Sequence, residues 1–113
     1  MMARILLTFA LIFSCQAAFS FDFVGCQVVE VVVADVQNAH VHLNCAVANR
    51  PACATDSFFT FDKSTTAGKE YLAMAMSAQA LGAYLTGNIV HDEGSCPTWQ
   101  SNVALLNHLR MTR

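Results

Sequence analysis

A run of β-branched residues decides the class of fold: Val28-Val29-Glu30-Val31-Val32-Val33. Such side chains crowd a helix but fit the pleated surface of a strand, so a strand is predicted over 28–36. Turn-tolerant residues follow at 35–39, and the next stretch alternates between polar and apolar: His40-Val41-His42-Leu43-Asn44-Cys45. Together they predict a hairpin that turns Val41, Leu43 and Cys45 to one face and His40, His42 and Asn44 to the other.

The rest of the chain predicts three further strands around one helix. Apolar residues on both faces of the first strand place it in the middle of a sheet or under a neighbour. A short strand is expected at 57–61, a helix at 65–81 and another strand at 85–91. The tail at 99–111 suits a helix or a closing strand, and we choose a strand. This order is that of the OB-fold, a five-stranded barrel with its helix between strands 3 and 4.

The composition limits the chain to one small domain. Of its 113 residues, an export signal at 1–20 would leave a single domain at 21–113, which has room for one core. Charged residues make up 12% of the chain, and the formal net charge is −2. Because no basic patch can hold phosphates, we expect no nucleic-acid partner.

The first residues have the pattern of a secretory signal. Arg4 is the only charged residue among the first 21, and an apolar run follows at 5–13. This run is shorter than the roughly 20 residues of a membrane span. Ala18 and Ser20 supply the small residues of a cleavage site after position 20, whereas the alternative of lipid attachment at Cys15 has a poorer pattern. We therefore expect a secreted or periplasmic protein without a membrane span, unless the signal is retained.

Four cysteines remain after removal of the signal: Cys26, Cys45, Cys53 and Cys96. An even count in a small exported chain predicts disulfides. The alternative, a zinc site, needs close pairs such as Cys-x-x-Cys, whereas the nearest cysteines, Cys45 and Cys53, are eight positions apart. Four cysteines allow three pairings, and the spacing alone leaves all three open.

A more specific pattern begins at Phe59-Thr60-Phe61-Asp62-Lys63-Ser64-Thr65-Thr66-Ala67-Gly68 and continues through an Ala-rich segment to Gly82. It resembles a family of small exported bacterial proteins, and more distantly the B subunits of the subtilase-cytotoxin and pertussis-like AB5 toxins. Their downstream signature is also similar to Gly94-Ser95-Cys96-Pro97-Thr98-Trp99. The resemblance covers residues 28–109.

The resemblance implies an OB-fold barrel, a Cys53–Cys96 disulfide and a ring of five subunits whose helices face a central channel. Cys26–Cys45 then follows by elimination. These two residues lie near the outer ends of the expected hairpin, and only a bulge would align them. The resemblance carries over no binding residue.

The expected helix is apolar on two sides. One stripe contains Tyr71, Met74, Ala75, Ala78, Leu81 and Gly82. The opposite side contains Leu72, Met76, Ala80 and Ala83. A small barrel buries one stripe only, so we expect the interface of a homo-oligomer at Leu72, Met76 and Ala83. Small residues at Ala73, Ser77 and Ala80 would let a second helix approach.

Histidines are the candidate metal ligands. His40 and His42 share a strand face, with His91 and His108 as remote candidates, but a third ligand is missing. We therefore expect a solvated histidine pair, with no metal and no cofactor.

Two other groups have alternative interpretations. Asp92 and Glu93 are adjacent carboxylates in an expected turn, where successive side chains diverge, so we expect them to be solvated rather than an acid/base pair. Trp99 could stack on a sugar ring, but its place three residues after Cys96 favours packing over the disulfide.

The sequence contains none of the common hydrolase, zinc-protease or phosphate-binding motifs, so we expect no catalytic residue and no enzyme. Two function classes remain. The first is a secreted binding module that recognises a glycan or a partner protein as a homo-oligomeric ring. The alternative is a structural or assembly protein of the periplasm or cell exterior, with no small-molecule ligand.

Overall fold

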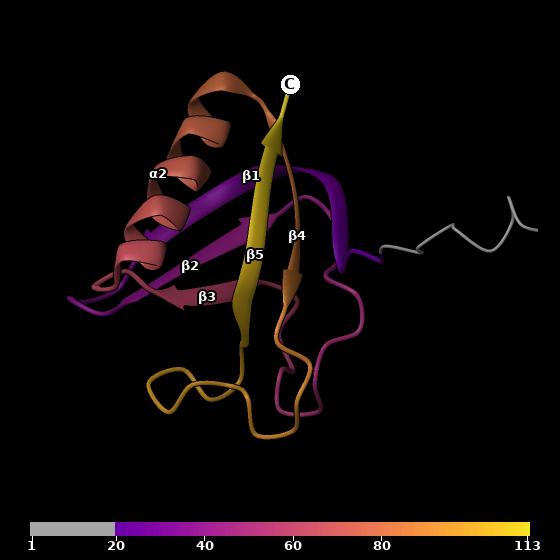
Figure 1. The fold of residues 1–113 in the computed structure, drawn as a ribbon, viewed down its shortest axis with the longest axis vertical. Helices are drawn as coiled ribbons and strands as arrows, with labels where there is room; N and C mark the ends of the chain where they lie inside the picture. The colour runs from indigo at the N-terminus through magenta and orange to yellow at the C-terminus, as the bar shows by residue number, and fades with distance from the viewer. Residues whose placement is uncertain (1–19) are drawn as a thin grey trace, which may run out of the picture.

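The computed structural model describes residues 20–113, so the expected signal peptide lies outside the described residues except for Ser20. This part of the chain is mainly β, with one helix (Figure 1). The elements follow in the order β1 (Phe23–Val33), β2 (Asn38–Leu43), β3 (Phe59–Asp62), α2 (Thr66–Leu81), β4 (Tyr84–Ile89) and β5 (Ala104–Thr112). The predicted order is confirmed, including the helix between β3 and β4 and the strand at the tail.

The five strands form one sheet that closes into a ring, in the order β1-β2-β3-β5-β4. β1 pairs with β2 along its second half and with β4 along its first, so both of its edges are paired. Its two faces are not both covered, contrary to the prediction from the valine-rich sequence, because Val29 is 61% exposed and Val33 is 55% exposed. All neighbours are antiparallel except β3 and β5, which are parallel and pair over only two residue pairs.

The core fills the inside of this ring. Period-two alternation turns Val41, Phe59 and Phe61 inward, where they meet Leu85 and Ile89 from β4. The ring of Phe23 stacks on that of Phe59, with centroids 5.2 Å apart. Burial of these side chains stabilises the fold by roughly 2 kcal/mol each.

Two disulfides cross-link the fold: Cys26–Cys45 and Cys53–Cys96. Cys26 lies on β1 and Cys45 just after β2, whereas Cys53–Cys96 joins the loop between β2 and β3 to the loop between β4 and β5. Both pairs are those expected above.

Polar groups and glycines set the ends of α2. The side chain of Thr65 accepts a hydrogen bond from the backbone N–H of Gly68, and Gly82 ends the helix in the left-handed conformation. Gly68 is buried against β3 so closely that a Cβ there would clash with the carbonyl oxygen of Asp62. The absence of a side chain at Gly68 therefore lets the start of α2 pack against the end of β3.

The stripes predicted for α2 need three corrections at its C-terminal end. Leu81 and Gly82, expected in the core, are exposed, Leu81 by 55%, and Ala83, expected in an exposed interface, is only 2% exposed. The reason is Gly82: its left-handed turn leads the chain back to β4, so helical spacing no longer applies at Ala83. Met76 is 55% exposed, as expected, whereas Leu72 is half-buried and packs against the core.

Ala73, Ser77 and Ala80 are exposed on α2 together with Met76. The helix therefore presents small and apolar residues on its outer side, while Ala75 and Ala78 face the core. Within residues 20–113, no helix has the length and apolar character required to cross a bilayer.

Candidate functional site

Two histidines project from the outer face of β2. Ala39 and Val41, which alternate with them, have no exposed surface, so His40 and His42 point away from the core. The face predicted for these histidines is thus confirmed. Asn44 lies beyond the end of the strand, where its side-chain oxygen accepts a hydrogen bond from the backbone N–H of Gln27 at 2.9 Å.

Phe58 completes a cluster with these histidines. It directly precedes β3, the neighbour of β2, and its ring stacks on His42 with centroids 4.1 Å apart and an interplanar angle of 23°. The His40 ring is 4.9 Å from Phe58 and 5.3 Å from His42. We call His40, His42 and Phe58 the imidazole–phenyl cluster. All three side chains are half-buried, so each ring also has surface open to solvent.

Gln100 brings a polar group to the cluster from the loop between β4 and β5. Its Nε2 lies 3.3 Å from Nδ1 of His40. Its Oε1 is buried and has no hydrogen-bond partner among the described residues. An unpaired buried acceptor costs about 1–3 kcal/mol, so the contacts of the cluster do not fully satisfy the Gln100 amide.

The surroundings of His40 disfavour its charged form. Burial lowers the pKa of His40 from its usual value, and the neighbouring His42 lowers it further, while Glu30 acts in the opposite direction. Glu30 lies directly across from His42 in the register of β1 and β2. His40 is therefore an uncharged imidazole at pH 7, and the nearest charge on the sheet is a carboxylate.

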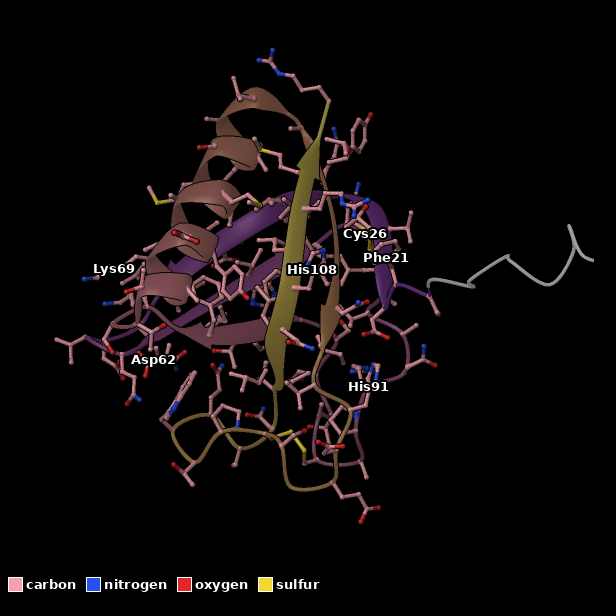
Figure 2. The ribbon with its side chains drawn as sticks, in the orientation of Figure 1. Phe21, Cys26, Asp62, Lys69, His91 and His108 are labelled. Carbon is pink, nitrogen blue, oxygen red and sulfur yellow. A yellow bond between two sulfur atoms is a disulfide. The ribbon has the colours of Figure 1, made fainter. Side chains whose placement is uncertain are left out.

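The remote histidines do not join the cluster. His91 Nε2 lies 2.7 Å from Asp22 Oδ2, and His108 stacks on Phe21 with centroids 6.3 Å apart. Figure 2 shows His91 near the lower end of β4, His108 beside β5 and Phe21 at the start of β1. Over residues 20–113, no group of three or more His, Cys, Asp or Glu side chains is arranged to hold a metal ion.

Asp22 anchors the start of β1. Its buried carboxylate accepts hydrogen bonds from the backbone N–H of Ile89 at 2.9 Å, from His91 at 2.7 Å and from Asn49 Nδ2 at 3.3 Å. His91 itself is largely exposed. Ile89 ends β4, His91 belongs to the loop between β4 and β5, and Asn49 belongs to the loop between β2 and β3. Asp22 therefore holds these three segments together.

The other residues singled out in the sequence lie in the loop between β4 and β5. Asp92 and Glu93 are exposed, and the carbonyl of Asp92 accepts a hydrogen bond from the backbone N–H of Ser95, which confirms the predicted turn. Trp99 is half-buried in the same loop, next to Gln100.

A pocket of about 340 Å³ lies between the start of α2 and the diverging ends of β3 and β5. Phe61, Tyr71 and Leu106 line it, with Asp62 among its polar residues. The Asp62 carboxylate is already bound to Ser64 and Gln37, and the Tyr71 hydroxyl donates to the carbonyl of Asn107. Because these polar groups are paired, the imidazole–phenyl cluster is the stronger candidate site.

Sequence reasoning found the two histidines and missed Phe58 and Gln100. A signal for Phe58 was present: Phe58 and Phe59 are adjacent, and neighbouring residues of a strand face opposite sides. Since Phe59 is inward, Phe58 belongs to the outer face beside the histidines. Nothing in the sequence places Gln100 there, because its loop is positioned by the disulfide and by contacts far apart along the chain.

Comparison with known proteins gives no further assignment: no family model, characterised protein or solved structure matches the chain.

Proposed function

We propose that the chain is an exported, non-enzymatic OB-fold module that binds a glycan through the imidazole–phenyl cluster. The fold assignment is supported by the strand order β1-β2-β3-β5-β4 and by the helix between β3 and β4. The two disulfides agree with folding in an oxidising compartment, the periplasm or the cell exterior.

The position of the cluster carries the proposal. OB-folds bind oligosaccharides and oligonucleotides on the face of strands 2 and 3, beside the loops between strands 1 and 2 and between strands 4 and 5. Here His40 and His42 lie on β2, Phe58 directly precedes β3, and Gln100 comes from the loop between β4 and β5. Three separate segments thus converge on the part of the fold where OB-fold ligands bind.

Charge favours a glycan over a nucleic acid. Binding of a phosphate backbone needs several cations, whereas this chain has a net charge of −2, and Glu30 adjoins the cluster. Aromatic rings have an electron-rich face that suits the polarised C–H groups of a sugar, and the Gln100 amide can pair with its hydroxyls.

The exposed side of α2 supports a second element of the proposal, a homo-oligomeric ring. Met76 lies there among Ala73, Ser77 and Ala80, whose small side chains permit close approach of another helix. The same surface favours the alternative function, a structural or assembly protein without a small-molecule ligand.

A glycan array separates the two functions. We expect the purified protein to bind a subset of glycans, and His42→Ala to lose at least tenfold in affinity. The matched control is His108→Ala, which also removes an imidazole stacked on a phenyl ring but at a different place on the surface. Absence of binding at high micromolar protein would favour the structural role, and equal loss in both variants would place the site elsewhere.

A further inference from the structure

We infer that the sugar residue bound by the imidazole–phenyl cluster is uncharged: a neutral hexose unit rather than a uronic or otherwise acidic sugar. This inference rests on the proposed function and specifies the ligand of the same site.

The electrostatics of the cluster disfavour an anion. A carboxylate needs a cation or several N–H donors to replace its water. The phenyl ring of Phe58 has electron-rich faces and carries no positive charge, and the residue across from His42 on β1 is Glu30, a carboxylate. His40 is uncharged at pH 7 because burial and His42 both oppose its protonation. An acidic sugar would therefore lose hydration without gaining an ion pair.

The five cations of residues 20–113 are Arg50, Lys63, Lys69, Arg110 and Arg113. Lys63, Lys69 and Arg110 lie away from the cluster. Lys63 follows the far end of β3, five residues and about 16 Å of strand away from Phe58. Figure 2 shows Lys69 beside the start of α2. The Arg110 guanidinium lies over the ring of Phe21 at 5.3 Å, and Arg50 adjoins Asn49, whose amide bonds to Asp22.

The polar groups at the cluster match hydroxyls. The amide Nε2 of Gln100 lies 3.3 Å from Nδ1 of His40, and the His40 ring is itself uncharged. A sugar hydroxyl can pair with neutral polar groups, whereas a carboxylate also needs a compensating positive charge. The partly exposed rings of His42 and Phe58 then supply apolar contact for the C–H groups of the sugar.

Matched ligands test this inference. Affinities are measured by titration with neutral hexose oligosaccharides and with their uronate counterparts, which differ only by a carboxylate at the sixth carbon. We expect the neutral ligands to bind at least tenfold more tightly to the wild type at pH 7.5 and low salt. Glu30→Lys replaces the adjoining carboxylate with a cation and should reduce this preference severalfold, whereas Glu30→Gln should reduce it less.

The outcomes are distinguishable. Uronates that bind as tightly as the neutral ligands, or more tightly, overturn the inference and leave the proposed glycan-binding function in place, provided that His42→Ala abolishes their binding. Binding of neither class, across the full set of hexoses, overturns the proposed function and this inference with it.

Discussion

The α-carbons of Cys26 and Cys45 lie 5.8 Å apart because Val29 adds one residue to β1. Glu30 pairs with His42, but Val28 pairs with Leu43, so Val29 forms a bulge between them. Had the register set by Glu30 continued, Gln27 would lie opposite Cys45. The bulge moves Cys26 into that position, within the range of distances that a disulfide spans.

We predict that the folded, exported protein contains both disulfides and no free thiol. The sequence separations are 19 and 43 residues, for which loop entropy gives about 3 kcal/mol for Cys26–Cys45 and about 4 kcal/mol for Cys53–Cys96. Peptide mapping without reduction checks the pairing, and denaturation of the paired Cys→Ala variants checks the free energies. A reactive thiol in the native protein, or a mixed pairing, would show that this arrangement is wrong.

The hairpin illustrates how far the sequence alone could go. Alternation over 40–45 predicts which side chains face inward, because burial of one face follows the period of a strand. The same pattern could not locate the bulge, since Val29 is one of five valines in the run 28–33. The bulge lies near the point where the pairing of β1 with β4 ends and its pairing with β2 begins. Because these partners are distant in the sequence, the residues around Val29 do not indicate where the bulge occurs.

Asp22 should be a major contributor to stability. Asp22→Ala removes the acceptor of the buried Ile89 N–H and of two side-chain donors, so we expect the free energy of unfolding to fall by about 3 kcal/mol. Urea denaturation measures the loss. His91→Ala is the matched control: it removes one exposed partner and leaves the Ile89 hydrogen bond intact, so its effect should be under about 1 kcal/mol. Equal losses in the two variants would mean that the backbone hydrogen bond is not the important one.

The protein should not depend on a bound metal. His40 and His42 contact Phe58 and each other, while His91 and His108 are engaged elsewhere. We therefore expect EDTA to leave the melting temperature unchanged, as measured by scanning calorimetry at pH 7.5. A decrease of several degrees that zinc restores would reveal a metal site, since a ligand that binds only the native state raises its stability.

Stability should fall on mild acidification because of His40. Its pKa is lower in the folded protein than in the unfolded chain, so the unfolded state takes up the proton first. The contribution of His40 is therefore complete above its unfolded pKa, near 6.5, and is lost as the pH falls through the folded value. We expect unfolding free energies measured between pH 7.5 and 5 to decline in the wild type and to decline less in His40→Gln. Identical pH profiles for the two proteins would contradict this assignment.

Only part of the candidate site could be predicted from the sequence, because some of its residues are far apart along the chain. His40 and His42 are neighbours on one strand, so their proximity follows from local periodicity. Gln100 lies 60 positions from His40 and reaches it only because the ring of strands and the Cys53–Cys96 bridge bring the loop to β2. Likewise, Ala83 could not be placed correctly without the turn at Gly82, because helical spacing does not extend to the two residues after Leu81.

Self-association through α2 is the last prediction. Of the three interface residues expected from the sequence, Met76 alone is more than half exposed, and it lies among small exposed residues. If this side of the helix is buried between copies, Met76→Asp places a charge in an apolar contact at a cost of several kcal/mol. Light scattering should then show a homo-oligomer for the wild type and a smaller species for the variant.

Ser101→Asp is the matched control, because it adds the same charge at an exposed position in the loop between β4 and β5. Its oligomer should equal that of the wild type. Circular dichroism of both variants should remain native, since neither Met76 nor Ser101 belongs to the buried core. A wild-type protein that stays monomeric at high micromolar concentration would refute the assembly, and the exposed side of α2 would then need no partner.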